Sequence, residues 1–169
     1  MSRLRRLLVT GRIFFITTHF DQASLPVRPA DRDEVLRALA ATRECRGLWL
    51  FAYCVMPTHF HLMFGPRGDD SMSSIMREMK LQAAKRILRA RNTPGRFWQP
   101  RSFVRIIRHR KEWGKTMDYI HWNPVKDGCA EKPEDWLWSS WFGWNPGGTP
   151  PVPVDFVDLP IDEKAPIGW

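Results

Sequence analysis

The stretch that most constrains this 169-residue chain is LWLFAYCVMPTHFHLMF, residues 48–64. It consists of two apolar runs rich in aromatic and β-branched residues, separated by Pro57, which has no backbone N–H to donate to a β-ladder. In the second run, apolar residues alternate with His59 and His61, a pattern typical of a strand with one face packed on a core. The stretch therefore predicts two strands joined at Pro57.

His59 and His61 lie two residues apart, so a strand directs both side chains to the same face, with Cα atoms about 6.5–7 Å apart. Two imidazoles at that spacing can bind one metal ion. Each could instead be a hydrogen-bonded surface or core residue, because His-x-His also occurs by chance. The rest of the chain has to distinguish these readings.

Hydrophobic periodicity predicts the elements on either side of this hairpin. Residues 12–20 are predicted as a strand that ends near His19, a residue expected in a turn or close to the histidine pair. Residues 31–45 and 73–91 are predicted as helices, and residues 103–107 as a short fourth strand. The order strand, helix, strand, strand, helix, strand predicts an α+β fold, the ferredoxin-like βαββαβ antiparallel sheet with two helices on one face.

A further helix is predicted from Lys111 to about Trp122, ending before Pro124, and it is left to cover the other face of the sheet. Tyr119 and Asn123 are four residues apart and share one side of this helix. Tyr119 stands out in a basic, polar segment. It is either a functional residue or a half-buried tyrosine with its hydroxyl bonded.

Composition predicts one domain over residues 1–145 and a Pro/Gly-rich, acidic, irregular tail over residues 146–169. No apolar run approaches the roughly 20 residues of a membrane span, so we expect a cytoplasmic protein that does not contact membranes. Three cysteines without a C-x-x-C pair argue against a disulfide framework or a zinc knuckle.

The net charge of +8 is concentrated between Arg77 and Lys126, where fourteen lysines and arginines face three acidic residues, a local excess of +11. Such an excess with interspersed aromatic residues indicates a nucleic-acid partner, bound with a strong dependence on salt. The residues predicted to contact phosphates are Arg3, Arg5, Arg6, Arg77, Lys80, Lys85, Arg96, Arg101, Arg105, Arg108, Arg110 and Lys126.

Four motifs in order resemble a known family. MPTHFHLMF is similar to its MPNHxHLL signature, GRFWQPRSFVRII to LWQxRFxxxxI, YIHWNPVKDG to YIxxNPVRAG, and PEDWLWSS to its closing YPWSS box. Together they cover about residues 55–140. The chain thus resembles the REP-associated tyrosine transposases, which belong to the HUH single-tyrosine transposases of bacterial insertion sequences.

The resemblance implies an endonuclease and strand transferase that acts on single-stranded or hairpin DNA of repetitive palindromic elements, close to the nucleoid. His59 and His61 would be the HUH histidines and, with Asn123, would hold Mg²⁺ or Mn²⁺. Tyr119 would be the nucleophile and form a 5′-phosphotyrosine. No nucleotide cofactor is expected, because the sequence contains no G-x-x-x-x-G-K-[ST] motif.

Some positions stay open. His121 either orients the tyrosine or faces solvent, and Thr58, which replaces an asparagine usual in the family, is expected to point away from the histidines. Two other functions fit the same residues: a catalytically silent DNA-binding protein, and a metal-dependent phosphodiester hydrolase that uses only His59 and His61. The sequence allows a monomer or a homodimer.

Overall fold

The computed structural model describes residues 12–156 of the chain. Its main elements, in order, are β1 (Ile13–Phe20), α2 (Pro29–Arg46), β2 (Leu48–Val55), β3 (His59–Pro66), α3 (Met72–Arg91), β4 (Trp98–Ile107) and α4 (Arg110–Lys126). Short helices η1 (Gln22–Ser24), η2 (Pro133–Asp135) and α5 (Trp141–Trp144) lie in the connections. The predicted order of strands and helices is confirmed.

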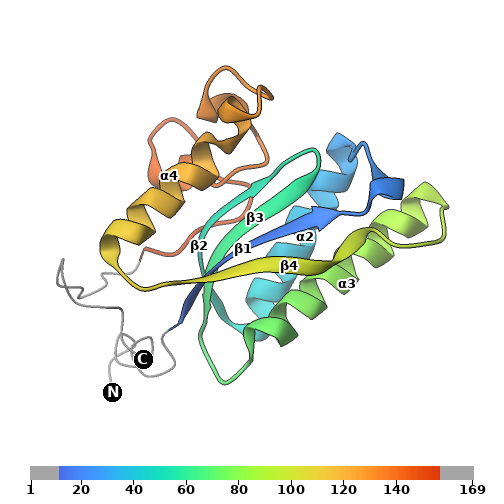
Figure 1. The fold of residues 1–169 in the computed structure, drawn as a ribbon, viewed down its shortest axis with the longest axis horizontal. Coiled ribbons are helices and arrows are strands. Elements are labelled where there is room, and N and C mark those ends of the chain that lie inside the picture. The colour runs from blue at the N-terminus through green and yellow to red at the C-terminus, as the bar shows by residue number, and fades with distance from the viewer. Residues whose placement is uncertain (1–11, 157–169) are drawn as a thin grey trace.

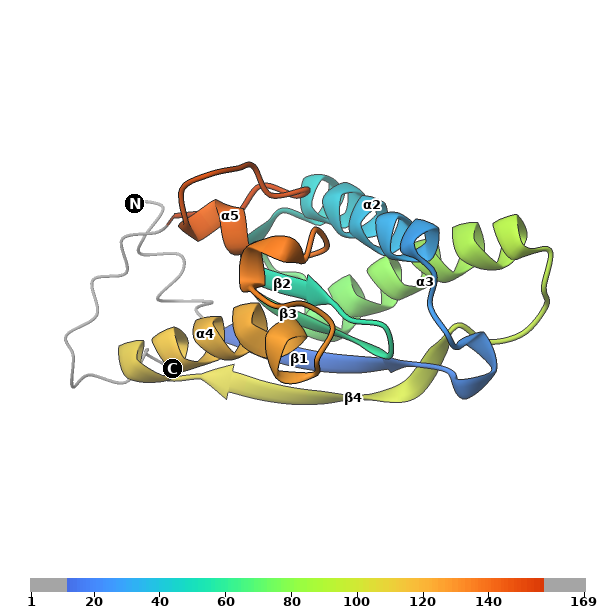
Figure 2. The same ribbon diagram turned by 90° about the horizontal axis from the view of Figure 1, so that it is seen from above.

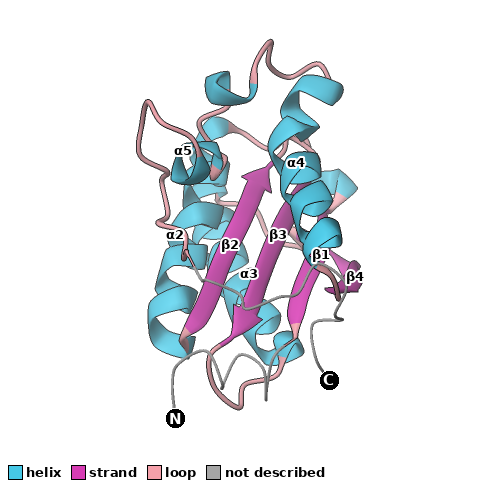
Figure 3. Cartoon of the chain, turned by 90° about the vertical axis from the view of Figure 1, so that its left-hand side faces the viewer, coloured by secondary structure: helices cyan, strands magenta, loops and turns pink. Residues whose placement is uncertain are grey.

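The four strands form one antiparallel sheet in the order β2-β3-β1-β4. Helices α2 and α3 lie behind the sheet in Figure 3, and α4 crosses in front of it. Figure 1 shows the same three layers from another side. The α+β, ferredoxin-like architecture with two helices on one face is therefore confirmed. Within residues 12–156, no strand pairs with the outer edge of β4, which is seen along its length in Figure 2.

Strand alternation divides the buried residues into two cores. Phe60, Leu62 and Phe64 point toward α2 and α3 and belong to the larger core, as the alternating pattern predicts. Met63 points the other way and packs in a smaller core beneath α4 with Ile120 of that helix. His61 shares this second face, so both faces of β3 are covered.

Two predicted boundaries were wrong. The fourth strand begins at Trp98 rather than Phe103, because Trp98 packs on Phe20 and donates its indole N–H to the Lys80 carbonyl at 2.9 Å. Pro100 is tolerated inside it because β4 is an edge strand. Helix α4 runs through Pro124 to Lys126, since a proline in the last turn removes only one intrahelical bond.

The first part of the predicted tail has no helix or strand beyond residue 144, but it is anchored on β2. The Tyr53 hydroxyl donates to the Val152 carbonyl at 3.0 Å and accepts from its N–H at 2.7 Å. Asp155 accepts from the Leu50 N–H and pairs with Arg43. Residues 146–156 thus pack on the domain, and the proposed boundary at residue 145 stays a prediction.

Candidate active site

His59 and His61 lie side by side on the face of the sheet that α4 covers. Their Nε2 atoms are 2.9 Å apart, so both side chains point to the same face, as strand alternation predicts. His61 is 1% exposed, whereas His59, at the start of the strand, is partly exposed. The pair therefore opens to solvent only on the His59 side.

Helix α4 supplies the third polar group. Asn123 is buried in its last turns and places Oδ1 3.1 Å from His59 Nε2. Because Tyr119 is one helical turn earlier on the same side, the helix brings Tyr119 and Asn123 to the histidines together. The structure thus brings His59, His61 and Asn123 together, and their binding of one divalent ion stays a prediction.

The geometry of these three residues fits a divalent cation. Ligands at neighbouring corners of an octahedron with bonds of about 2.1 Å lie about 3.0 Å apart, close to the 2.9 and 3.1 Å separations found here. Among the described residues, no cluster of three histidines, cysteines or carboxylates is available as an alternative metal site. Two imidazoles and one amide oxygen also leave coordination positions open, as a catalytic site requires.

Two threonine hydroxyls orient the imidazoles. Thr17 Oγ1 is 2.8 Å from His61 Nδ1, and Thr58 Oγ1 is 2.9 Å from His59 Nδ1. When each Nδ1 carries the ring proton and donates it to the hydroxyl, both Nε2 lone pairs face the same point and repel each other unless a cation lies between them. The two hydroxyls thus favour the tautomer that binds a metal.

The expectation that Thr58 points away from the histidines was wrong, because it precedes β3 at the hairpin turn, where strand alternation does not apply. Thr17 was missed altogether. It lies opposite His61 in the β1–β3 register, and pairing between strands 44 residues apart leaves no local signal in the sequence.

Burial keeps the histidines neutral. Loss of solvation, together with the charge of the neighbouring His59, lowers the pKa of His61 to about 3. Burial also lowers the pKa of His59. Neutral imidazoles at pH 7 keep the lone pairs that a metal ion requires.

Tyr119 lies against the histidine pair with its side chain partly in solvent. The residue is 41% exposed, and its ring contacts those of His61 and Phe15 with centroid distances of 5.2 and 5.9 Å. Lys126 Nζ is 5.4 Å from the centre of the same ring. The tyrosine is thus held on one side and accessible on the other.

His121 neither faces solvent nor lies on the side of α4 that carries Tyr119. It is 2% exposed, and its Nε2 is 2.8 Å from the Ser140 hydroxyl. Being two residues from Tyr119, it leaves α4 on nearly the opposite side. Its solvent-facing placement is contradicted, and its contacts with Ser140 and Trp141 assign it a packing role between α4 and the start of α5.

His19 lies closer to the site than a turn residue would. It is the penultimate residue of β1, pairs with His59 in the sheet register, and has its ring centroid 5.5 Å from that of His59. Its side chain is exposed at the open side of the site.

The predicted phosphate-contacting residues fall on both sides of the sheet. Arg77, Lys80 and Lys85 belong to α3, whereas Arg105 faces α4, where it bonds Thr116. All those in the described part are exposed except Lys80, which is partly buried. Arg3, Arg5 and Arg6 lie outside the described residues.

Comparison with known proteins places this site in a family. Residues 25–123 match the family model "Transposase IS200 like". The chain is 30% identical over 141 residues to the REP-associated tyrosine transposase of Escherichia coli (strain K12), covering 83% of this chain and 82% of the relative. A solved structure of a REP-associated tyrosine transposase bound to a REP hairpin superposes with a TM-score of 0.70 at 28% identity, covering 93% of this chain and 92% of that one.

In the described part of the chain, no helix has the length and apolarity to cross a bilayer. The matched region contains the histidine pair, Tyr119 and Asn123, whose arrangement has just been described. The chain belongs to the IS200-like transposases, and within them to the REP-associated tyrosine transposases of the HUH type, enzymes that cleave DNA and transfer strands.

Proposed function

We propose that this protein cleaves and rejoins single-stranded or hairpin DNA through a covalent bond to Tyr119, with His59, His61 and Asn123 holding a divalent metal ion. The observation that supports this most strongly is the position of His59 Nε2, which lies 2.9 Å from His61 Nε2 and 3.1 Å from Asn123 Oδ1. These three atoms lie beside Tyr119, which is 41% exposed. A related protein bound to a REP hairpin supports hairpin DNA as the substrate.

The ligands would be His59 Nε2, His61 Nε2 and Asn123 Oδ1, with Mg²⁺ or Mn²⁺ as the ion. When bound, the ion supplies Lewis-acid polarisation of the scissile phosphate. The threonine hydroxyls on the Nδ1 atoms keep the two rings turned toward the ligand position. Because His61 is buried, water cannot reach the position between the ligands from the His61 side.

Tyr119 would act as the nucleophile. Its phenol oxygen attacks phosphorus, a Tyr Oη–P bond forms, and the P–O3′ bond breaks. The phenol proton passes to water at the exposed edge of the ring, and the leaving 3′ oxygen takes up a proton. Lys126, 5.4 Å from the ring, is placed to attract the phosphate toward the phenol.

A second 3′-hydroxyl reverses this step, because the phosphotyrosine bond retains the energy of the phosphodiester. The exposed arginines of β4, Arg101 and Arg105, share the α4 side of the sheet and would bind the DNA backbone near the tyrosine. Contacts with phosphates carry no sequence information, so these two arginines would bind DNA without distinguishing its bases.

The test is a search for the covalent product. Labelled single-stranded DNA carrying the repeats that flank the gene is incubated with the protein and Mn²⁺ and run on a denaturing gel. We expect a band of protein-linked DNA that chelation of the metal prevents. Binding without any adduct would favour the silent DNA-binding protein, and cleavage without an adduct would favour the hydrolase.

A further inference from the structure

Trp122 of α4 is a large aromatic residue that the fold leaves 43% exposed. Its ring meets that of Trp141 edge-on, with the centroids 6.3 Å apart, so its orientation is held. Trp141 is itself partly exposed, and Tyr119, three residues before Trp122, is 41% exposed. Single exposed apolar residues are common on protein surfaces, whereas a contiguous apolar surface marks a binding site. The three rings therefore indicate a ligand next to the proposed nucleophile.

Trp122 is placed to reach the DNA that Tyr119 would attack. Residues three apart on a helix are neighbours, with Cβ atoms about 5–6 Å apart and side chains about 60° apart around the axis. Trp141 also packs edge-on against His121, with centroids 5.7 Å apart, and His121 leaves α4 on nearly the opposite side from Tyr119. Trp141 thus supports Trp122 from the side away from Tyr119, which leaves the side toward Tyr119 for a ligand.

Positive charge lies between the rings of Tyr119 and Trp122. At about 100° per residue, Lys115 and Lys126 project into the sector of α4 between the two rings. Both lysines are exposed, and Lys126 Nζ is 5.4 Å from the centre of the Tyr119 ring. The exposed carboxylate of Asp118 lies on the far side of Trp122. Because lysines attract phosphates, a DNA strand can place its backbone along the lysines and a base on Trp122.

The chemistry proposed for Tyr119 decides which nucleotide lies beside Trp122. The attacking phenol oxygen and the leaving 3′ oxygen are in line on opposite sides of phosphorus. The nucleotide that carries the leaving 3′ oxygen is therefore directed away from Tyr119 and from its neighbours on α4. The nucleotide joined through its 5′ oxygen branches to the side of this line, and it stays bonded to Tyr119 after the P–O3′ bond breaks.

We propose that Trp122 stacks on the base of the nucleotide directly 3′ of the scissile phosphate, the one that stays bonded to Tyr119. This inference rests on the proposed function. Every base has a face that can stack on an aromatic ring, so Trp122 holds this nucleotide without selecting its sequence. The stacked base keeps the phosphotyrosine end of the DNA in place until a second 3′-hydroxyl attacks it.

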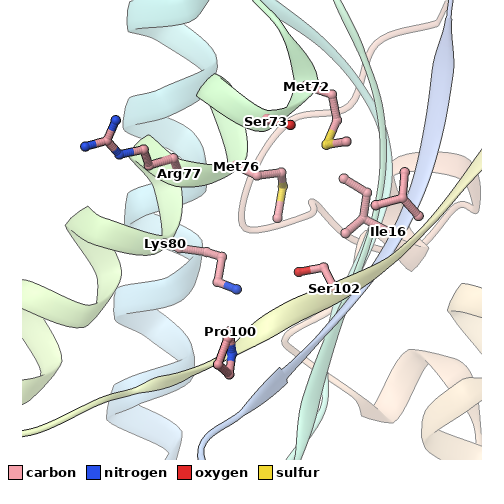
Figure 4. A pocket seen from close by; sticks show the side chains of 9 residues that line it. Ile16, Met72, Ser73, Met76, Arg77, Lys80, Pro100 and Ser102 are labelled. Carbon is pink, nitrogen blue, oxygen red and sulfur yellow. The ribbon is translucent and has the colours of Figure 1, made fainter.

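The base beside Tyr119 has to be held from the α4 face itself. A cavity of about 350 Å³, lined by Met76 and Lys80 of α3 among others, lies on the opposite face of the sheet (Figure 4). It therefore cannot contact a nucleotide bonded to Tyr119. The exposed lysines beside Trp122 favour a polyanion over a second protein chain as the ligand of this surface.

The test begins by mapping the position of the tyrosine adduct on DNA made from the repeats that flank the gene. Binding is then measured by fluorescence anisotropy in a Tyr119→Phe background, so that the DNA stays intact. The nucleotide 3′ of the mapped phosphate is either normal or abasic. We expect the abasic nucleotide to weaken binding about 5- to 100-fold, the range for loss of one stacked base.

Trp122→Leu removes the aromatic face but keeps an apolar side chain against Trp141. It should weaken binding of the normal DNA by a similar factor, and the abasic nucleotide should then cost it nothing further. Trp122→Phe keeps an aromatic face and should retain most of the affinity. Trp122→Gln provides a second variant without a ring should Trp122→Leu unfold, and thermal denaturation checks the fold of each variant.

Leu137→Ala is the matched control, because Leu137 is 65% exposed and lies outside α4. It should bind both DNAs like its parent. A second measurement places 2-aminopurine at the same nucleotide, since stacking quenches the fluorescence of this base analogue. The complex with Trp122 should show quenching that Trp122→Leu loses, whereas a probe in the hairpin stem should not distinguish the two proteins.

An abasic nucleotide that weakens the parent and Trp122→Leu by the same factor would overturn the assignment while the tyrosine adduct persists. Unchanged DNA binding by Trp122→Leu would overturn it as well and favour a protein partner at this surface. A wild-type protein that forms no adduct would overturn the proposed function itself, and this inference with it.

Discussion

The two faces of the sheet have opposite characters. The face under α2 and α3 holds a continuous apolar core, in which Leu39, Leu62 and Phe64 are fully or almost fully buried. The face under α4 has a smaller core, and next to it lie His61, Asn123 and the partly exposed Tyr119. The face under α2 and α3 is covered mainly by apolar side chains, whereas the face under α4 keeps polar atoms pointed at one position.

This difference indicates how the fold separates stability from chemistry. Burying polar groups costs free energy unless each has a partner, and on the α4 face threonine hydroxyls and the Asn123 amide supply those partners. The larger core can carry that cost because its residues are apolar. Substitutions on the two faces should therefore affect different measurements.

The largest effect is expected for Tyr119→Phe, which removes the proposed nucleophilic oxygen and keeps the ring packed on His61. Adduct formation should fall at least about 10³-fold, to the limit of detection, while hairpin affinity stays within about twofold. Denaturing gels measure the adduct and fluorescence anisotropy measures the affinity.

Tyr53→Phe is the matched control, because Tyr53 is the only other tyrosine and lies buried with its hydroxyl bonded to Val152. It should lower stability but form the adduct. Cleavage by Tyr119→Phe at the same position and rate as the wild type would show that water is the nucleophile.

Leu39→Ala tests the other face. Leu39 is fully buried in the larger core, so its truncation leaves a cavity and should lower the free energy of unfolding by about 2–5 kcal/mol. Urea denaturation measures the loss. At low temperature, the folded fraction should form the adduct at the wild-type rate. A catalytic defect per folded molecule would show that the two faces are coupled.

Thr17→Val sharpens the comparison within the α4 face. The substitution keeps the shape of the side chain but removes the hydroxyl that holds His61 Nδ1, so metal affinity should fall about 10- to 100-fold. Titration of adduct formation with Mn²⁺ measures the change, and excess Mn²⁺ should restore activity. Thr17→Ser keeps the hydroxyl and should behave like the wild type. Failure of Mn²⁺ to rescue Thr17→Val would contradict an orienting role.

The smallest effect concerns acid stability of the helical layer. Burial alone would raise the pKa of Asp31, but hydrogen bonds from Arg91 and Arg28 lower it from 3.8 to about 2. The unfolded chain then binds a proton that the folded chain does not. The ionised Asp31 carboxylate therefore contributes stability above about pH 4, and this contribution is lost as the pH falls toward 2.

The contribution is about 2 kcal/mol, from the size of the pKa difference. Urea denaturation between pH 5 and pH 2 should show a shallower loss for Asp31→Asn than for the wild type, together with lower stability at pH 7. Identical pH dependence of the two proteins would exclude Asp31 as a source of acid sensitivity.

Local patterns in the sequence were enough for the order of elements and the central motif. Alternation between His59 and Phe64 determined which side chains share a face, and the four-residue spacing of Tyr119 and Asn123 placed them on one side of a helix. These are properties of a single strand and a single helix, so they do not depend on distant residues.

Only the tertiary structure decided the features that join distant segments. The pairing of Thr17 with His61, the bond from Thr58 to His59, and the burial of His121 against Ser140 all depend on register and docking. The extension of α4 through Pro124 and of β4 back to Trp98 likewise depends on neighbours that tolerate or stabilise it. Sequence periodicity determines the faces of an element, whereas its partners are selected by the free energy of packing the whole domain.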